Sequence, residues 1–263
     1  MDLGLKDKRA FVAGSSGGIG RAVAEGLAAE GCAVMLCARS EEKLARAAQE
    51  LSDAHGVRAE YVCADLDRVE DIEAAVDRMN EVFGGCDILV ANNGGPNPGD
   101  FRSMSEEDWL AGWNRTLMST VRLIRGFLDG MIAQEWGRIV NITSISVKQP
   151  VQRLLLSNTY RAGVTGMAKT LSDEVCAHGV TVNNVAPGYI KTGRQTQLFT
   201  DRAEKAGTSY ESVRDDVVAK IPMGRIGTPD EIADMAVFLS SDRASYITGA
   251  TIQVDGGIFR GLM

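Results

Sequence analysis

Residues 9–31 read RAFVAGSSGGIGRAVAEGLAAEG, an apolar strand pattern followed at once by a glycine-rich turn and a helical pattern. Glycines in such a turn let the backbone approach a pyrophosphate closely and let the helix pack against the strand. The N-terminus of the helix presents free N–H groups and a partial positive charge, which favour an anion. The stretch therefore predicts a dinucleotide-binding turn rather than an ordinary loop. The residues expected at the cofactor are Gly14, Ser16, Gly18, Ile19 and Gly20.

The rest of the chain alternates short apolar runs with longer helical patterns, which is typical of strand–helix–strand units and a parallel sheet. We predict one domain over residues 1–263, an α/β Rossmann fold with a seven-stranded, doubly wound parallel sheet flanked by helices. Continuous apolar runs indicate strands that are buried on both faces. The strands are expected at residues 9–14, 33–38, 59–65, 88–93, 137–143, 180–188 and 250–255. The helices are expected at residues 18–30, 41–54, 68–83, 105–134, 158–178 and 229–240.

Residues 191–225 interrupt this alternation. The segment is polar and helix-prone, and it lies between the sixth and seventh expected strands. An insert beyond the carboxyl end of a sheet is more often a substrate lid than a structural necessity. We therefore expect residues 191–225 to form a lid.

Composition and charge exclude several classes of partner. Asp and Glu number 35 against 28 Lys and Arg, which gives a net charge of -7, and the basic residues form no block. This balance argues against a nucleic-acid partner. No run of about 18 apolar residues appears, so no membrane partner is expected. The first residues, MDLGLKDKRA, carry charge where a signal peptide needs an apolar stretch, and we expect a cytoplasmic protein.

Cysteine and histidine are too few and too scattered to predict a metal site. The two histidines, His55 and His178, each lie in an AHGV sequence that is typical of a helix end before a strand. The cysteines are odd in number and have no CxxC spacing, so we expect reduced residues of the core. They are Cys32, Cys37, Cys63, Cys86 and Cys176.

The end of the second expected strand, Cys37-Ala38-Arg39-Ser40, indicates which dinucleotide binds. A domain that prefers NAD usually places Asp or Glu here to hold the ribose hydroxyls, and Ala38 cannot do so. The guanidinium of Arg39 is suited to a 2′-phosphate, which it can bind through two hydrogen bonds. We predict NADP, with Arg39 and Ser40 at the cofactor; a solvated surface Arg at a helix start is the alternative interpretation.

The pattern resembles the short-chain dehydrogenase/reductase family, particularly β-ketoacyl carrier-protein reductases. The glycine turn is similar to the family's TGxxxGIG with Ala13 in place of Thr, and residues 222–257 resemble its C-terminal stretch almost throughout. The likeness extends from about residue 5 to residue 257 and implies an NADP-dependent oxidoreductase. It also implies a homotetramer joined through the helices at 105–134 and 158–178 and through the C-terminal segment. Further cofactor contacts are implied at Asp65, Leu66, Asn92, Gly94, Pro187, Gly188, Ile190 and Thr192.

Three of the four catalytic residues of that family are replaced in this chain. In the family a Tyr phenol protonates the carbonyl oxygen, a Lys lowers the pKa of the phenol, a Ser polarises the carbonyl and an Asn anchors a proton relay. Ser144 stands at the Ser position, whereas counting along the motifs places Ser157 at the Tyr position and Arg161 at the Lys position. Thr116 falls at the Asn position, and Asn114, two residues earlier, should face another side of its helix.

The candidate catalytic residues are therefore Ser144, Ser157, Tyr160 and Arg161. Serine is shorter than tyrosine and a weaker acid than a phenol of pKa about 10. Arginine can hold the nicotinamide ribose, but it does not release its proton at ordinary pH, so Arg161 is interpreted as a binding residue. Tyr160 lies three residues after Ser157 on a neighbouring face of the helix, where it either reaches the pocket or packs at a subunit interface.

Three functions are compatible with this pattern. The first is an NADP-dependent oxidoreductase for a carbonyl or hydroxyl substrate, with Ser144 polarising the oxygen and another group or water supplying the proton. The second is a related enzyme with different chemistry, such as an isomerisation or dehydration, in which a substrate carboxylate meets Arg161. The third is a non-catalytic protein that binds NADP. The intact cofactor motifs favour the first.

Overall fold

The computed structural model describes residues 1–262, which contain one sheet of seven parallel strands in the order β3-β2-β1-β4-β5-β6-β7. This arrangement confirms the predicted fold class. All seven expected strands are present, each within two residues of its expected limits. The strands are β1 (Arg9–Ala13), β2 (Ala33–Ala38), β3 (Ala59–Cys63), β4 (Ile88–Ala91), β5 (Gly137–Ile142), β6 (Val180–Pro187) and β7 (Thr251–Val254).

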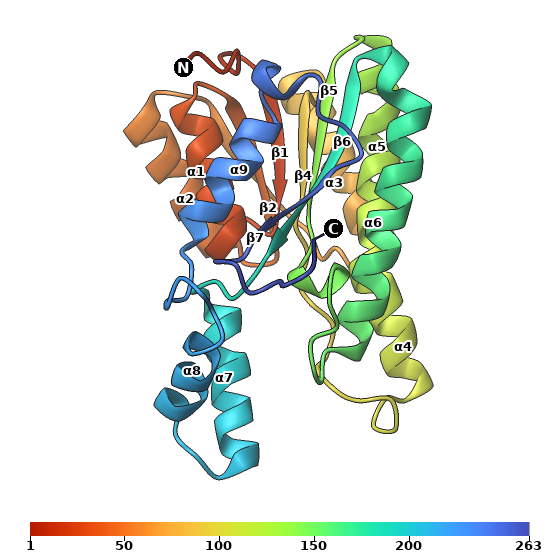
Figure 1. The fold of residues 1–263 in the computed structure, drawn as a ribbon. Helices are drawn as coiled ribbons and strands as arrows, with labels where there is room; N and C mark the ends of the chain where they lie inside the picture. Colours follow the sequence, from red (N-terminus) through yellow and green to blue (C-terminus); the bar gives the residue numbers. More distant parts are fainter. Residues whose placement is uncertain (263) are drawn as a thin grey trace.

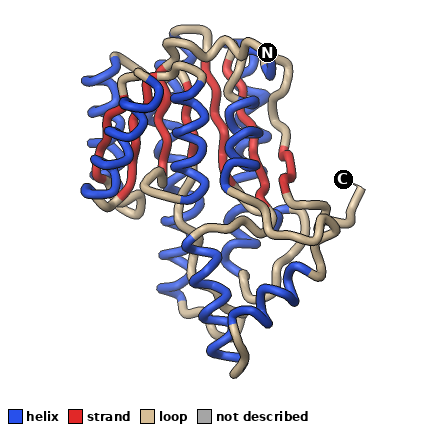
Figure 2. The backbone as a smooth tube through the Cα atoms, turned by 90° about the vertical axis from the view of Figure 1, so that its left-hand side faces the viewer, coloured by secondary structure: helices blue, strands red, loops and turns tan. Residues whose placement is uncertain are grey.

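Helices cover both faces of the sheet (Figures 1 and 2). On one face lie α1 (Gly18–Ala29), α2 (Glu41–His55) and α9 (Pro229–Leu239). On the other face lie α3 (Val69–Phe83), α5 (Ser119–Ala133) and α6 (Leu155–Val175). The sheet is thus the middle of three layers, as a doubly wound fold requires.

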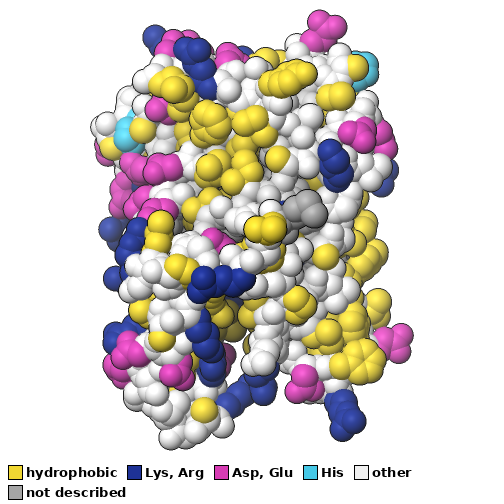
Figure 3. Space-filling model, in the orientation of Figure 1, with side chains coloured by type: hydrophobic (Ala, Val, Ile, Leu, Met, Phe, Trp, Pro, Cys, Tyr) yellow, Lys and Arg dark blue, Asp and Glu magenta, His cyan; other side chains and the backbone are white. Residues whose placement is uncertain are grey.

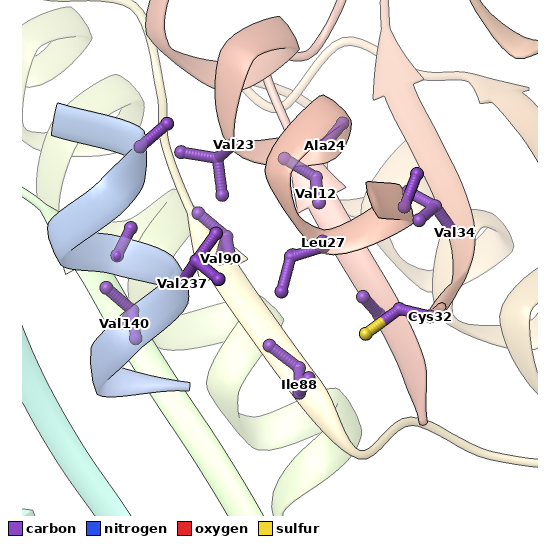
Figure 4. Packing of buried hydrophobic residues seen from close by; sticks show 14 of the residues in the cluster. Val12, Val23, Ala24, Leu27, Cys32, Val34, Ile88, Val90, Val140 and Val237 are labelled. Carbon is purple, nitrogen blue, oxygen red and sulfur yellow. The ribbon is translucent and has the colours of Figure 1, made fainter. Parts of the chain in front are cut away.

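Side chains of the inner strands alternate between the two cores. Val12 belongs to the cluster under α1 and α9, whereas its neighbour Phe11 belongs to the cluster under α3 and α5. This follows from the two-residue period of a strand. Figure 4 shows Val12, Val90 and Leu27 together in the first cluster, where all three are fully buried. Burial of each such side chain contributes about 1.5–3 kcal/mol to stability.

The two edge strands differ from the prediction of burial on both faces. Every residue of β3 and β7 is half-buried or exposed, because each strand has a neighbour on one side only. The expectation that the cysteines belong to the core is accordingly wrong for Cys63, at the end of β3, and for Cys176, after α6, which are both exposed. Cys32, Cys37 and Cys86 are buried, and all five are free thiols.

The helix expected over residues 105–134 is divided by one wide turn. It consists of α4 (Glu106–Gly112), a π-helical segment (Trp113–Met118) and α5. The amide of Asn93 donates to the carbonyl of Thr116 at 3.0 Å and to the hydroxyl of Ser119 at 2.8 Å. A side chain that inserts into the helical hydrogen-bond ladder in this way widens the turn.

The segment at 191–225 forms a helical pair, α7 (Gly193–Ala206) and α8 (Tyr210–Val218), with a small core of its own. That core is built around Phe199, Val213 and Val217, with Tyr189 and Tyr210 packed against it. Figures 1 and 2 show the pair projecting beyond the sheet, on the side of the carboxyl ends of the strands. No helix among the described residues is long and apolar enough to cross a membrane.

An ion pair ties the amino ends of β1 and β4 together. Two nitrogens of the Arg9 guanidinium donate to Asp87 at 2.6 and 2.8 Å, and the backbone N–H of Arg9 donates to the same carboxylate at 2.7 Å. Burial alone would raise the pKa of Asp87, but the bonds from Arg9 outweigh it and hold the pKa below its usual value.

Replacement Asp87→Asn should therefore lower the free energy of unfolding at pH 7 by about 1–3 kcal/mol, because a buried charge-assisted bond is lost. A carboxyl with a depressed pKa stabilises the fold above its unfolded pKa of about 3.9 and ceases to do so as pH falls through the folded value. The difference between the two proteins should hold from pH 7 to 5 and shrink below about pH 4. Urea unfolding measures both effects, with the exposed Asp129→Asn as the control that changes little. Equal stability of Asp87→Asn and the parent protein at pH 7 would contradict the assignment.

Candidate active site at the carboxyl edge of the sheet

The candidate site lies where the strand order reverses. β1 pairs with β2 on one side and with β4 on the other, so the connections that leave β1 and β4 run to opposite faces of the sheet. The crevice at such a point is where doubly wound folds bind ligands. Figure 1 shows the α7–α8 pair beyond the carboxyl ends of the strands.

The glycine turn is packed too closely to admit side chains. Gly14 and Gly18 have φ values of +62° and +57°, which glycine adopts without strain. A Cβ on Gly14 would lie 2.6 Å from the carbonyl oxygen of Asn92, and a Cβ on Gly20 would collide with the carbonyl of Gly14. The first turn of α1 therefore rests directly on the end of β1.

Two polar side chains hold the turn to its neighbouring strands. The amide of Asn92 donates to the carbonyls of Ala13 and Gly14 at 3.3 and 3.4 Å. The buried hydroxyl of Ser15 accepts from the backbone N–H of Cys37 at 2.9 Å, which ties the turn to β2. Ser16, which the sequence predicts to contact the cofactor, is half-buried, and no described residue bonds its hydroxyl.

The N-terminus of α1 is suited to an anion. Its N-cap residue, Gly17, makes no side-chain cap, and its first turn contains no acidic residue. Its N–H groups are therefore available to a phosphate group, and the helix dipole favours the negative charge. The residues present thus fit a dinucleotide pyrophosphate.

The residues predicted for the adenosine end gather at the same edge. Arg39 follows β2 directly and is exposed, and no described residue forms a salt bridge with it; Ser40 is the N-cap residue of α2. Asp65, after β3, accepts a hydrogen bond from the backbone N–H of Asp67 at 3.1 Å, and Leu66 is half-buried beside it. A free guanidinium here is compatible with a 2′-phosphate.

Most of the remaining residues predicted to contact the cofactor lie at the end of β6 and just after it. Pro187 ends β6, and Gly188 lies so close to Asp255 that a Cβ would approach it to 2.8 Å. Ile190 is buried, and Thr192 is the N-cap residue of α7, its hydroxyl accepting from Gln195 at 3.2 Å. The methyl group of Thr192 lies 3.3 Å from the Cβ position of Gly18, so the start of α7 faces the glycine turn. Gly94 is exposed in the loop after β4.

Ser144, Ser157 and Arg161 meet beyond the end of β5. The hydroxyl of Ser144 accepts from the backbone N–H of Ser146 at 3.1 Å, and the hydroxyls of Ser146 and Ser157 lie 3.5 Å apart. Arg161, one turn after Ser157 on α6, donates to the carbonyls of Ile142 and Thr143 at 2.9 and 3.1 Å. Burial, together with the charge of Arg194, lowers the pKa of Arg161 to about 10, so it stays a cation at neutral pH.

Tyr160 does not join this cluster. Its hydroxyl donates to the carbonyl of Trp109 at 2.8 Å, and its ring packs edge-on against that of Trp109 with centroids 5.9 Å apart. Burial raises the pKa of the phenol, which makes it a poorer proton donor. Tyr160 therefore packs against Trp109 of α4 within the same chain, and no hydrogen bond among the described residues joins its phenol to Ser144 or Ser157.

Asn114 and Thr116, the two residues considered for the Asn position of the family, lie in different surroundings. The Asn114 amide bonds the carbonyl of Asp67 and accepts from Arg122 at 2.6 Å, so it faces the loop after β3. Thr116 lies in the π-helical segment, and its buried hydroxyl has no hydrogen-bond partner among the described residues. Asn114 thus points away from Ser144, as its place on the helix indicated.

Arg194 is a residue of the crevice that the sequence analysis missed. It lies in the first turn of α7 and donates to the carbonyl of Pro96 at 2.9 Å, across from the insert to the loop after β4. A Cβ on Gly95 would lie 2.9 Å from this guanidinium, so the group rests on the backbone of that loop. The only sequence signal was its place two residues after Thr192, in a segment interpreted as a lid.

Comparison with known proteins adds independent findings. Residues 13–259 match the family model described as enoyl-(acyl carrier protein) reductase. The chain is 37% identical to the 3-oxoacyl-[acyl-carrier-protein] reductase FabG of Aquifex aeolicus, over 98% of this chain and 100% of the relative. It is 34% identical to the uncharacterized oxidoreductase YvrD of Bacillus subtilis, over the whole of both chains. Among solved structures, L-sorbose reductase from Gluconobacter frateurii, complexed with NADPH and L-sorbose, matches the whole of both chains with a TM-score of 0.95 and 35% identity.

The packing of the glycine turn predicts that one alanine substitution destabilises the protein and that another, three residues earlier, does not. Gly20→Ala should lower the free energy of unfolding by about 1–3 kcal/mol and weaken dinucleotide binding, because the methyl group forces α1 away from the turn. Gly17→Ala is the matched control, since its backbone is extended and a Cβ there would meet no atom within 4 Å. Thermal unfolding should therefore separate Gly20→Ala from both the parent and Gly17→Ala. Equal melting temperatures for all three proteins would contradict the packing described.

Proposed function

The chain belongs to the short-chain dehydrogenase/reductase family of oxidoreductases, and we propose that it transfers hydride between NADP and a carbonyl or hydroxyl substrate at the Ser144–Ser157–Arg161 cluster. The observation that carries the proposal is the place of this cluster. It lies at the carboxyl edge of the sheet, beyond β5, in the same crevice as the glycine turn that follows β1. Relatives named 3-oxoacyl-[acyl-carrier-protein] reductase support a 3-oxoacyl-like substrate.

NADP is the cofactor that the residues favour. The glycine turn and the uncapped N-terminus of α1 hold the pyrophosphate, and Arg39 and Ser40 hold the 2′-phosphate. Asp65 and Leu66 flank the adenine, while Asn92 fixes the turn. Arg161 holds the nicotinamide ribose. The structural relative L-sorbose reductase was determined with NADPH, which supports this choice.

The protein's own groups polarise the carbonyl and stabilise the alkoxide. When bound, NADPH supplies the hydride. The hydroxyl of Ser144 donates to the substrate oxygen, and the buried cation of Arg161 stabilises the negative charge that develops there. Ser157 is shorter and less acidic than the phenol of the family, so it holds a water molecule that delivers the proton rather than acting as the acid itself.

A second function is favoured by one observation. Neither Arg161 nor Arg194 has a carboxylate partner within residues 1–262. A reaction other than a simple reduction, on an acidic substrate held by Arg161, would use this charge. Ketone reduction remains the first proposal because the cofactor residues are complete.

Two structural features extend the proposal. The α7–α8 pair, residues 191–225, acts as a lid over the substrate, since it stands opposite the cluster and contacts the loop after β4 through Arg194. The protein assembles as a homotetramer through α4, α5 and α6 and through the C-terminal segment, and the exposed apolar side chains of Leu110 and Trp113 support an interface on the side of α4.

The choice of cofactor predicts that Arg39→Ala weakens NADP binding at least tenfold and leaves NAD binding nearly unchanged. A charge-assisted bond contributes about 1.5–3 kcal/mol, and about 1.4 kcal/mol is a factor of ten in affinity. Ala38→Asp combined with Arg39→Ala should reverse the preference, because the new carboxylate repels the 2′-phosphate. Calorimetric titration measures both dinucleotides, with the exposed Arg46→Ala on α2 as the control that keeps the parent preference. Equal affinities of the parent protein for NADP and NAD would contradict the assignment of Arg39 to the 2′-phosphate.

The altered cluster predicts slow reduction of simple ketones. General acid catalysis contributes about 10²- to 10⁴-fold, and the acid of the family is absent. The combined change Thr116→Asn, Ser157→Tyr and Arg161→Lys should raise the rate of NADPH oxidation with a β-ketoester while NADP affinity stays similar.

Tyr160→Phe is the control for that experiment, and it should leave the rate of the parent protein unchanged because its phenol bonds Trp109. Rapid reduction by the unmodified protein, lost in Tyr160→Phe, would place the proton donor at Tyr160 and overturn the account.

A further inference from the structure

Asp67, in the loop after β3, is held by two consecutive residues of the π-helical segment. The Arg115 guanidinium donates to the Asp67 carboxylate through a terminal nitrogen at 2.6 Å and through Nε at 2.9 Å. The amide of the preceding residue, Asn114, donates to the backbone carbonyl of Asp67. Both the side chain and the main chain of one loop residue are therefore fixed from a segment that lies 47 residues further along the chain.

The loop after β3 has few other supports. β3 is an edge strand, so its loop has a neighbouring strand end on one side only. Within the loop, the backbone N–H of Asp67 donates to the carboxylate of Asp65 at 3.1 Å, and the backbone N–H of Asp65 donates to Asp71 of α3 at 2.9 Å. These bonds join residues close in sequence, so they shape the turn without fixing its place. Among the described residues, only the two π-helical residues reach residues 65–68 by hydrogen bonds from a distant part of the chain.

The π-helical segment is itself anchored to the end of β4. Asn93, two residues after β4, donates to the carbonyl of Thr116 and to the hydroxyl of Ser119. The hydroxyl of Ser119 in turn donates to the carbonyl of Arg115 at 2.5 Å. The Cδ of Arg115 lies 3.8 Å from the Cβ position of Gly94, so its side chain passes over the loop after β4. One path of contacts therefore runs from the end of β4, through the wide turn, to the loop after β3.

The ion pair between Arg115 and Asp67 is only partly exposed to solvent. The two side chains keep 35% and 28% of their exposure, respectively. The hydrogen bonds to Asp67 raise the pKa of Arg115 against the opposing effect of burial, and the charges of Asp67 and Asp65 add to the rise. On the face shown in Figure 3, Lys and Arg side chains are interspersed with Asp and Glu, and the chain has a net charge of -7. Loss of Arg115 would therefore leave the Asp67 carboxylate without a counter-ion.

We propose that Arg115, together with Asn114, is a positioning residue for the adenosine half of the dinucleotide. It acts through Asp67, which follows directly after the proposed adenine contacts Asp65 and Leu66. A loop that is already held in its binding conformation loses less conformational freedom when the ligand binds, so the affinity is higher. The inference rests on the proposed function for the place of the adenine, and it adds a residue that supports the cofactor without touching it.

A direct contact between Arg115 and a phosphate of the cofactor is the alternative role. Two of the three guanidinium nitrogens bond Asp67, which directs the group toward the loop. The two roles differ in what they predict. A contact with the 2′-phosphate affects NADP alone, and a contact with the pyrophosphate does not need Asp67. An action through the loop affects every ligand that contains adenosine and depends on both partners of the ion pair.

The test measures the binding of NADP, NAD and ADP by calorimetry, since ADP carries the adenosine half without the nicotinamide. Arg115→Ala and Asp67→Asn should each weaken the binding of all three ligands by about fivefold or more, with the ratio of NADP to NAD affinity within about twofold of the parent. The double variant should lose no more than the weaker single variant, because both changes break the same contact. Arg115→Lys keeps the charge and should regain part of the affinity.

Arg78→Ala is the matched control. Arg78 pairs with Glu81 on α3 at 2.9 Å, so this change breaks an ion pair away from the loop and should leave all three affinities unchanged. Hydrogen exchange without ligand measures the loop directly, and the amides of residues 65–68 should exchange faster in Arg115→Ala than in the parent protein. If Arg115→Ala does not fold, Arg115→Lys and Asp67→Asn provide the same comparison.

Three results would overturn this inference and leave the proposed function intact. The first is unchanged affinity for all three ligands in the Arg115 and Asp67 variants. The second is loss of NADP binding alone in Arg115→Ala, which would assign the guanidinium to the 2′-phosphate. The third is weaker binding in Arg115→Ala but not in Asp67→Asn, or losses that multiply in the double variant, either of which would indicate a direct contact with the cofactor. A parent protein that binds none of the three ligands would instead contradict the proposed function and the inference with it.

Discussion

The close approach of the first turn of α1 to the end of β1 is the constraint on which the site depends. Gly20 lies against the carbonyl of Gly14, and Asn92 bonds the same turn from β4, so no side chain larger than hydrogen fits at either glycine. This packing aims the N-terminus of α1 into the crevice between β1 and β4. It also fixes the spacing between the cofactor end of the crevice and the start of α7, because Thr192 contacts the turn at Gly18.

The positive charge on the opposite wall of the crevice comes from Arg161. The guanidinium of Arg161 is anchored by two main-chain carbonyls at the end of β5, so its position is set by the sheet itself. Such a group cannot pass on a proton at neutral pH, but it can stabilise an anion without moving. The hydroxyls of Ser144, Ser146 and Ser157 complete a polar wall that contains no strong acid. Under the proposed function, these groups would act by stabilising charge.

Features set by local pattern could be predicted from the sequence, and features set by distant contacts could not. The seven strands and the glycine turn follow from apolar runs and glycine spacing, which act over a few residues. The π-helical turn at Thr116 could not be predicted, because it is opened by Asn93 from another part of the chain. The same is true of Arg194, whose role depends on a contact with Pro96 nearly a hundred residues away, and of Tyr160, whose hydroxyl bonds Trp109 on a separate helix. Exposure of Cys63 depended on strand order, which apolar content does not reveal.

The central claim is that one crevice holds NADP along the glycine turn and presents its nicotinamide to the Ser144–Ser157–Arg161 cluster. A crystal structure of the protein grown with NADP tests this most directly. We expect the pyrophosphate at the N-terminus of α1, the 2′-phosphate against Arg39 and the nicotinamide ribose within hydrogen-bond distance of Arg161. A dinucleotide bound with its nicotinamide directed away from Ser144 and Arg161, or bound outside the crevice between β1 and β4, would contradict the account.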